Sequence, residues 1–321
     1  MKYILVTGGL GFIGSHTCVE LLKHNYNIVI IDNLVNSKID VIENIKKIIN
    51  IDNLFFHNID IRDKDKLEEV FTKYNFNLII HFAGLKAVKE SIMNPLLYYD
   101  NNVIGSLNLF SIAKKYNVNN IIFSSSATVY GENIYPVNEE ASVGKNITNP
   151  YGQTKYMVEC ILKDMVKEND KLSVVILRYF NPVGAHQSGL LGEDPNDIPN
   201  NLFPHILKKK LTIFGSDYKT EDGTCVRDFI HVVDLAKGHI KSMKQMDKPG
   251  CYIYNLGSGK GVSVLEFIKT FEKVNKVKID YTFSDRREGD IECVYAKVDK
   301  AEKELGWKCN LTLEDICKNK Y

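Results

Sequence analysis

The chain begins with an apolar strand, a glycine-rich turn and a helical pattern in direct succession. Residues 2–7 form the apolar run, Gly8, Gly11 and Gly14 follow at intervals of three, and the apolar positions of residues 15–23 predict a helix. Glycines allow a backbone to approach a pyrophosphate closely, and the amide N–H groups at a helix N-terminus meet its negative charge. This order of elements predicts a dinucleotide-binding turn.

A second apolar strand, residues 28–31, ends in Asp32. In dinucleotide-binding folds an acid about 20 residues beyond the glycine turn accepts hydrogen bonds from the adenosine ribose hydroxyls. Because a carboxylate repels a 2′-phosphate, Asp32 favours NAD over NADP as the cofactor. The alternative is a tight turn that binds no ligand, with Asp32 as a solvated loop acid.

Apolar strands and helical patterns continue to alternate up to about residue 180. Further strands are predicted at 54–59, 78–82, 121–126 and 174–178, and helices at 39–49, 64–74, about 96–116 and from residue 150. Near-continuous apolar strands separated by helices are typical of a parallel sheet covered on both faces. We therefore expect an α/β protein with a Rossmann-type, doubly wound parallel sheet.

Ligands of such sheets bind at the carboxyl ends of the strands. The residues at these ends are expected to converge on one crevice: Asp60, Ala83, Gly84, Ser124, Ser125, Ser126 and Asn181. Beyond this point glycine and proline interrupt the pattern, and the elements become short. We predict an NAD-binding domain over residues 1–180 and a smaller α/β substrate-binding lobe over residues 181–321.

The composition excludes several classes of partner. The 321 residues carry a formal net charge of +1 with no basic field, so no nucleic acid partner is expected. Seven cysteines without a Cys-x-x-Cys pair suit reduced thiols and predict neither a disulfide framework nor a metal site. No apolar run approaches the length of a membrane span. We expect a cytoplasmic protein without a membrane partner.

One helix start carries candidate chemistry. Asn149 is suited to cap this helix and Pro150 to its first position, which puts Tyr151 and Lys155 one turn apart on the same face. A neighbouring cation lowers the pKa of an acid by ~1–3 units, so Lys155 is expected to make a Tyr151 phenolate available as a base. The alternative is an ordinary surface helix with a half-buried tyrosine and a solvated lysine.

Many longer runs resemble one family. They are Val-Thr-Gly-Gly-Leu-Gly-Phe-Ile-Gly-Ser-His-Thr (6–17), Asp-Asn-Leu-Val-Asn-Ser-Lys (32–38), His-Phe-Ala-Gly-Leu-Lys-Ala-Val (81–88), Phe-Ser-Ser-Ser-Ala-Thr-Val-Tyr-Gly (123–131) and Leu-Arg-Tyr-Phe-Asn-Pro-Val-Gly-Ala-His (177–186), with further runs at 98–103, 192–195, 198–202, 220–224, 226–228 and 286–290. With these runs the chain resembles the extended short-chain dehydrogenase/reductases, and within them the UDP-glucose 4-epimerase family.

The resemblance implies a reaction and three catalytic residues. UDP-galactose and UDP-glucose would interconvert through oxidation at C4 to a 4-keto sugar, rotation of that sugar and return of the hydride by NADH. Tyr151 would take the C4 hydroxyl proton and give it back, Lys155 would be its cationic partner and a ribose ligand, and Ser126 would orient the sugar. The UDP group would hold the hexose while it turns, and a homodimer is implied as well.

The resemblance also implies two sets of binding residues. NAD would lie against Gly8, Gly11, Phe12, Ile13, Gly14, Asp32, Asn33, Asn36, Ser37, Asp60, Ile61, Phe82, Ala83, Lys86, Asn101, Ser126, Tyr151, Lys155 and Phe180. The UDP-hexose would lie against Ser126, Tyr151, Asn181, Asn201, Leu202, Ile213, Phe214, Arg227, Arg287, Asp290 and Val294.

Two features depart from the family pattern. The segment between Asn201 and Thr224 is several residues shorter, which is expected to reshape one wall of the uridine site. Val294 is a small residue at a position that limits the room for the C2 substituent of the sugar, so UDP-N-acetylhexosamines are also predicted to fit.

Two alternatives stay open. One is another nucleotide-sugar enzyme of the same fold, either a different epimerase or a 4,6-dehydratase or decarboxylase. A dehydratase would want an acid pair after Ser126, where Ala127 and Thr128 stand instead. The other is a non-enzymatic NAD-sensing regulator, which has no need of Ser126, Tyr151 and Lys155 together.

Overall fold

The computed structural model describes residues 1–50, 53–194, 196, 201–207, 210–287 and 289–318. Parts of the runs and of the shortened segment discussed above lie outside the described residues. These are Pro195, Ile198, Pro199, Asn200, Lys208, Lys209 and Glu288.

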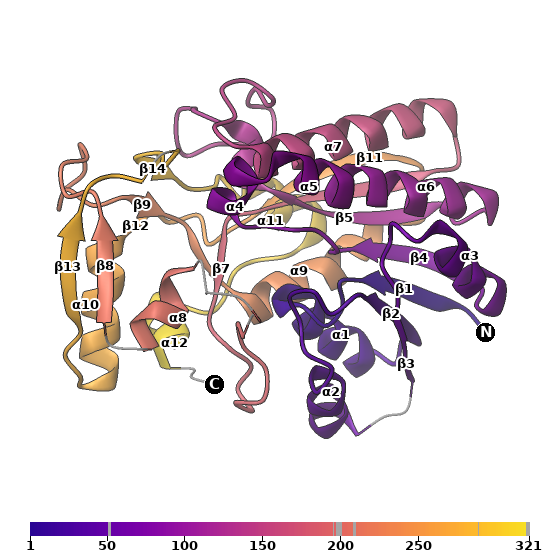
Figure 1. Ribbon diagram of the computed structural model, residues 1–321, viewed down its shortest axis with the longest axis horizontal. Coiled ribbons are helices and arrows are strands. Elements are labelled where there is room, and N and C mark those ends of the chain that lie inside the picture. Colours follow the sequence, from indigo (N-terminus) through magenta and orange to yellow (C-terminus); the bar gives the residue numbers. More distant parts are fainter. Residues whose placement is uncertain (51–52, 195, 197–200, 208–209, 288, 319–321) are drawn as a thin grey trace.

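A seven-stranded sheet with the order β11-β6-β5-β4-β1-β2-β3 forms the centre of the molecule (Figure 1). Its strands are β1 (Tyr3–Thr7), β2 (Ile28–Asp32), β3 (Leu54–Asn58), β4 (Phe76–His81), β5 (Asn120–Ser126), β6 (Ser173–Tyr179) and β11 (Gly250–Leu256). Every neighbouring pair is parallel. The first six strands follow the 3-2-1-4-5-6 order of a doubly wound dinucleotide-binding sheet, and the predicted fold class is confirmed.

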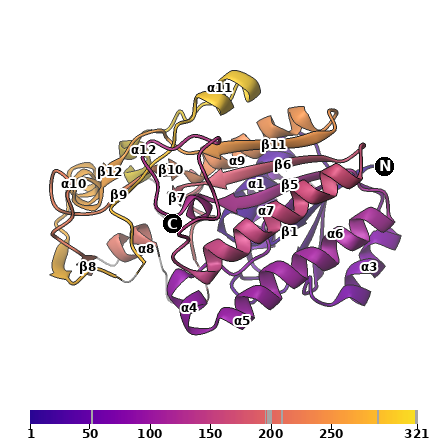
Figure 2. The same cartoon turned by 90° about the horizontal axis from the view of Figure 1, so that it is seen from above.

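Helices cover both faces of this sheet (Figures 1 and 2). The helices of one face are α1 (Phe12–Lys23), α2 (Val41–Ile49) and α9 (Val232–Ser242), and those of the other are α3 (Lys64–Lys73), α6 (Gly105–Lys115) and α7 (Pro150–Glu168). Alternation along the strands divides the core in two. Ile4 and Val6 pack with the first set of helices and Leu5 with the second, because successive strand side chains point to opposite faces.

The helix predicted over residues 96–116 is not one regular α-helix. After α4 (Val88–Met93), the chain forms α5 (Pro95–Tyr98), a π-helical segment over Tyr99–Ile104 and then α6. The π segment turns Asn101 and Asn102 inward, where both are buried. Asn102 Nδ2 donates to Thr154 Oγ1 of α7 at 3.0 Å and its Oδ1 accepts from Leu85 N at 2.8 Å. Apolar periodicity shows no sign of this change in helix type.

A second lobe follows β6 and lies beside one end of the sheet (Figure 1). Its strands are β7 (Asn181–Val183), β8 (Lys210–Phe214), β9 (Val226–Arg227), β10 (Phe229–His231), β12 (Val262–Ser263), β13 (Asp280–Ser284) and β14 (Cys293–Val294). Its helices include α8 (Leu202–Leu207), α10 (Val264–Asn275) and α12 (Leu313–Lys318). Phe203, Phe267 and Phe271 pack in a core of their own.

The division of the chain at residue 180 stays a prediction. The main sheet also takes in Gly250–Leu256, which pairs with β6, and α9 packs against α1. Helix α11 (Asp299–Leu305) contributes Ala301 and Leu305 to the same core. Parts of residues 181–321 therefore complete the layers of the first domain.

A buried ion pair fixes α7 on the sheet. Glu159 Oε1 accepts from Arg178 Nε at 2.9 Å, and Glu159 Oε2 accepts from Arg178 Nη2 at 2.7 Å. Ser125 Oγ donates to the same carboxylate at 2.6 Å. Burial alone would raise the pKa of Glu159, but the hydrogen bonds and charge of Arg178 outweigh it and hold that pKa below its ordinary value.

We predict that Arg178→Met destabilises the protein by about 3–5 kcal/mol, because it leaves the Glu159 carboxylate buried without its main partner. Urea unfolding of Arg178→Met, of Glu159→Leu and of the double variant Arg178→Met/Glu159→Leu measures the coupling energy between the two residues. The double variant should lose less than the sum of the single losses. Strictly additive losses would contradict the account.

Candidate active site

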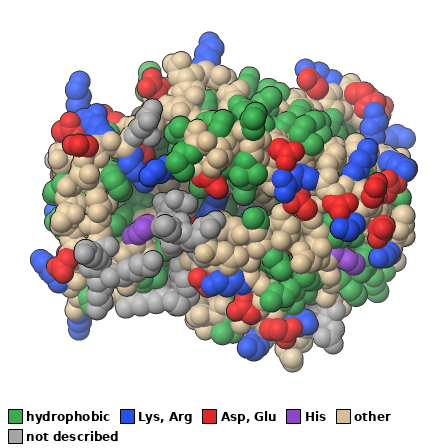
Figure 3. Space-filling view, in the orientation of Figure 1, with side chains coloured by type: hydrophobic (Ala, Val, Ile, Leu, Met, Phe, Trp, Pro, Cys, Tyr) green, Lys and Arg blue, Asp and Glu red, His purple; other side chains and the backbone are tan. Residues whose placement is uncertain are grey.

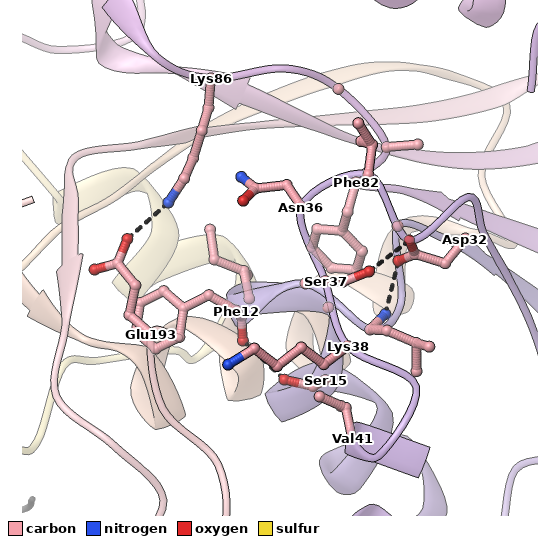
Figure 4. A pocket seen from close by; sticks show the side chains of 18 of the residues that line it. Phe12, Ser15, Asp32, Asn36, Ser37, Lys38, Val41, Phe82, Lys86 and Glu193 are labelled. Atoms are coloured by element: carbon pink, nitrogen blue, oxygen red, sulfur yellow. Dashed lines mark hydrogen bonds and ion pairs between the residues drawn. The ribbon is translucent and has the colours of Figure 1, made fainter. Parts of the chain in front are cut away.

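A cavity of about 400 Å³ lies at the carboxyl edge of the main sheet (Figure 4). That volume falls within the range of ~300–1,000 Å³ typical of ligand sites. Most of the predicted cofactor residues line it: Gly8, Gly11, Phe12, Ile13, Gly14, Asp32, Asn33, Asn36, Ser37, Ile61, Phe82, Ala83, Lys86, Asn101, Tyr151 and Lys155. Asp60, Ser126 and Phe180 do not line it, so the expected convergence of strand ends holds only in part.

The glycine turn leaves no room for side chains. Gly8 has φ +68°, and a Cβ placed there would lie 2.6 Å from the backbone nitrogen of Ala83. A Cβ on Gly14 would lie 2.3 Å from the Gly8 carbonyl oxygen. The turn therefore brings bare backbone to the cavity wall at the start of α1, which is the arrangement that a pyrophosphate requires.

Asp32 ties the next loop to this turn. Its carboxylate accepts hydrogen bonds from Leu10 N at 3.1 Å, from Leu34 N at 3.0 Å and from Ser37 Oγ at 2.8 Å. Figure 4 shows Asp32 and Ser37 together at one end of the cavity. Since an ionised carboxylate has about four acceptor positions, one remains available to a ligand hydroxyl. Asp32 is buried and is not the solvated loop acid of the alternative.

Asn36 points into the cavity from the same loop (Figure 4). Its Oδ1 atom is buried and has no hydrogen-bond partner within the described part of the chain. Buried polar atoms are seldom left unpaired, so this atom fits a wall that receives a polar ligand.

Asp60 lies outside the cavity but braces the loop through Asn33. Asn33 Nδ2 donates to Asp60 Oδ2 at 2.8 Å, and Arg62 Nη2 donates to the same oxygen at 2.7 Å. The hydrogen bonds from the Arg62 guanidinium lower the pKa of Asp60 to about 2. Asp60 is therefore ionised over the whole physiological range.

Helix α7 begins as predicted. Asn149 Oδ1 accepts from Gly152 N at 2.9 Å and Pro150 occupies the first turn. Lys155 is buried, and its ammonium donates to the Ser124 carbonyl oxygen at 2.7 Å and lies 5.0 Å from the Phe123 ring centroid. Burial lowers the pKa of Lys155 to about 8. The alternative of a solvated lysine is therefore wrong.

The expected lowering of the Tyr151 pKa is not found. Burial raises the pKa of Tyr151 above its ordinary value, and only the hydrogen bond with Ser126 acts in the opposite sense. The Lys155 ammonium lies 6.0 Å from the centroid of the Tyr151 ring, while its closest bond is to the Ser124 carbonyl. In the protein alone, loss of solvation therefore outweighs the hydrogen bond with Ser126.

The remaining catalytic and cofactor candidates, Ser126 and Phe180, do not line the cavity. Ser126 is buried at the end of β5, and its hydroxyl oxygen caps the short helix of residues 127–130 by accepting from Thr128 N at 3.2 Å. Phe180 is buried in a small apolar cluster with Tyr130 and Val137.

None of the predicted UDP residues beyond Tyr151 lines this cavity, but several gather in the second lobe. Arg287 Nε donates to Asp290 Oδ2 at 2.9 Å, and Arg227 lies 3.8 Å from the same carboxylate. The Arg287 guanidinium lies 5.0 Å from the ring centroid of Phe214, and Val294 pairs with Arg227 across β14 and β9. Two cations and an acid therefore meet at one place, as a pyrophosphate and a ribose require.

The other predicted UDP residues make contacts of their own. Asn201 Nδ2 donates to Glu193 Oε1 at 2.6 Å, and Asn181 N donates to the Asp228 carbonyl oxygen at 2.9 Å. Ile213 is buried in the core of the lobe, and Leu202 packs against that core. The Ile213 side chain is thus part of the packing, and its backbone pairs with Phe283 between β8 and β13.

Comparisons with known proteins agree with this geometry. A family model described as GDP-mannose 4,6 dehydratase matches residues 5–320. The chain is 50% identical to the UDP-glucose 4-epimerase of Bacillus subtilis (strain 168) over 99% of this chain and 95% of that protein. It is 52% identical to the UDP-glucose 4-epimerase of Pasteurella multocida (strain Pm70) over 99% of this chain and 96% of that protein.

The chain belongs to the UDP-glucose 4-epimerase family. The crystal structure of the UDP-glucose 4-epimerase from Bifidobacterium longum in complex with NAD⁺ and UDP has a TM-score of 0.95 and 49% identity, and the match covers 99% of this chain and 96% of that one. The family resemblance inferred from the motif runs is therefore confirmed. The broader description of the family model names a dehydratase, but these relatives are all UDP-glucose 4-epimerases.

The sequence of this family member did not reveal every residue of the cavity. Glu193 and Asp194 line it, and both bind lysines of the opposite wall. Tyr179 also lines it, and its hydroxyl is hydrogen-bonded to His239. The available signal for Tyr179 was its position at a strand end, the same signal that predicted Ser124, which lines the cavity as expected. Glu193 and Asp194 belong to the run of residues 192–195, but the sequence assigned no role to either of them.

Among the described residues, no group of three or more His, Cys, Asp or Glu side chains is arranged to hold a metal ion. No helix in the described ranges has the length and apolar character needed to cross a membrane.

Proposed function

We propose that this protein interconverts UDP-galactose and UDP-glucose with NAD as its cofactor. The observation that carries the proposal is the placement of Tyr151 and Lys155 on the wall of a cavity that begins at the glycine turn and Asp32. A dinucleotide lying along this wall would end beside the phenol. The family relatives and the NAD⁺ and UDP complex of one of them support the same assignment.

NAD supplies a hydride acceptor at the substrate carbon, with a cationic nicotinamide ring in its oxidised form. The residues of this chain bind the cofactor and orient it. The glycine turn meets the pyrophosphate, Asp32 accepts from the adenosine ribose, and Lys155 donates to the other ribose. Because a neighbouring cation lowers the pKa of a phenol, Tyr151 is expected to be a stronger base in the loaded protein than in the protein alone.

Tyr151 takes the proton from the C4 hydroxyl of the hexose and returns it to the rotated sugar. Ser126 orients the same oxygen. The UDP group is held by Arg227, Arg287 and Asp290, which keeps the hexose tethered while it turns. Fixed geometry of this kind replaces a bimolecular encounter and contributes to the rate.

Two alternatives are weaker. A 4,6-dehydratase needs an acid pair beside Ser126, and the positions that follow it are Ala127 and Thr128. A regulator that only senses NAD has no use for a buried lysine next to a tyrosine and a serine. Activity with UDP-galactose, without added NAD, separates the three: a dehydratase gives a deoxy sugar and a regulator gives no product.

We predict that Tyr151→Phe lowers the turnover of UDP-galactose by about 10²–10⁴-fold, because the proton acceptor is lost while the ring remains. Tyr156→Phe is the matched control, since it removes a hydroxyl from the same helix outside the cavity. A coupled assay for UDP-glucose measures both. Parent-like turnover by Tyr151→Phe would refute the assignment.

The small side chain of Val294 supports a wider sugar specificity. We expect UDP-GalNAc to be turned over beside UDP-galactose, and a Val294→Tyr variant to lose UDP-GalNAc while keeping UDP-galactose. Separate assays with the two sugars test this, and no turnover of UDP-GalNAc by the parent would end the hypothesis.

A homodimer would cover an exposed apolar surface on the first domain. Ile92, Met93, Leu96, Leu97, Ile104 and Leu107, from α4 through α6, are all more than a third exposed. Figure 3 shows hydrophobic side chains gathered over the upper part of the face where Figure 1 draws these helices. An exposed apolar patch of this kind fits a second copy of the chain.

Leu96 is the most exposed of these residues, at 81%. We predict that sedimentation finds a dimer for the parent and a monomer for Leu96→Glu, because a charge at the centre of an apolar contact is costly to bury. A monomeric parent would contradict the proposal.

A further inference from the structure

Glu193 lies where the cofactor cavity meets the second lobe. It is 4% exposed although it belongs to a loop that lines the cavity. Its Oε1 atom accepts from Lys86 Nζ at 2.8 Å and from Asn201 Nδ2 at 2.6 Å. Figure 4 shows Lys86 reaching across the cavity to Glu193. One carboxylate oxygen thus joins a residue that follows β4 to a residue that precedes α8.

Asp194 and Asn196 of the same loop also contact the first domain, but neither contact is a buried ion pair. Asp194 pairs with Lys38 on the surface, where their side chains are 63% and 41% exposed. Asn196 Nδ2 donates to the Ser37 carbonyl oxygen at 3.0 Å. Water screens an exposed pair, whereas a buried carboxylate depends on hydrogen-bond partners that stay in place. Of these three residues, Glu193 alone also bonds to Asn201.

We infer that Glu193 is a positioning residue that couples retention of NAD to binding of the nucleotide-sugar, an inference that rests on the proposed function. Lys86 is a proposed ligand of NAD and Asn201 a proposed ligand of UDP. UDP that engages Asn201 fixes the orientation of the Glu193 carboxylate, which in turn holds Lys86 over the cavity. The dinucleotide is therefore released more slowly when UDP is bound.

This coupling has a reciprocal form that a purely structural residue would not produce. If UDP slows the loss of NAD by strengthening its binding, then NAD strengthens the binding of UDP by the same factor. Loss of the Glu193 charge removes the link in both directions while the two sites themselves remain. The effect belongs to binding, so it appears in the KM for UDP-galactose more than in kcat.

The test measures the release of fluorescent NADH from the loaded protein after mixing with excess NAD⁺, with and without UDP. UDP should slow release by about fivefold or more in the parent, the lower end of typical coupling between sites. Glu43→Gln is the matched control, because it removes an exposed acid that pairs with Lys46 and does not line the cavity, and it should keep the parent response. Glu193→Gln should release NADH at the same rate with and without UDP.

A UDP response of parent size in Glu193→Gln would overturn the inference, as would a parent that shows no response. If Glu193→Gln does not fold, Lys86→Gln tests the same link from its more exposed partner and should abolish the response too. Failure of the proposed function is distinguishable from these outcomes. It would appear in the parent as an absence of bound NAD or of UDP-galactose turnover.

Discussion

The buried ion pair between Glu159 and Arg178 is the contact on which the arrangement of the site depends. Tyr151, Lys155 and Glu159 follow at intervals of four along α7, so they lie on one face of the helix. Glu159 is held by Arg178 of β6 and by Ser125 of β5. With that residue fixed, the face of α7 that carries Tyr151 and Lys155 is directed at the carboxyl ends of the same strands.

Local patterns in the sequence predicted the features that depend on neighbours in the chain. The glycine turn, the Asn149 cap and the parallel strands up to β6 follow from periodicity and turn chemistry, and the structure confirms them. The place of β11 beside β6 in the main sheet could not be predicted in this way. A strand that comes after much of the second lobe carries no local signal of the strand with which it pairs. The π-helical segment was missed for a related reason, since a segment of 6 residues is too short for its different period to show in the apolar spacing.

In the candidate site, too, local patterns identified some residues, whereas features that depend on burial or on distant residues were missed. Motif runs identified the residues around the turn, and the helix start with its spacing to Lys155 identified Tyr151. The sign of the Tyr151 pKa shift depends on burial, which spacing does not reveal. Glu193 was missed because its partner across the cavity, Lys86, lies 107 positions before it in the chain. Long-range pairs of this kind become visible only when the strands have been placed side by side.

The two lobes have distinct tasks in this account. The main sheet presents backbone and an acid to the cofactor, and the second lobe gathers two arginines and an acid for the nucleotide of the substrate. Tyr151 stands on the cofactor wall, close to Ser126 at the end of β5. This division explains how a sugar can turn over at its reacting carbon without leaving the protein.

The central claim is that hydrogen leaves C4 of the sugar and returns to the same carbon within one turnover. The most direct measurement follows UDP-galactose deuterated at C4 through the reaction and locates the label in the UDP-glucose formed. The account predicts that the deuterium is retained at C4. Replacement of that deuterium by hydrogen from the solvent would contradict it.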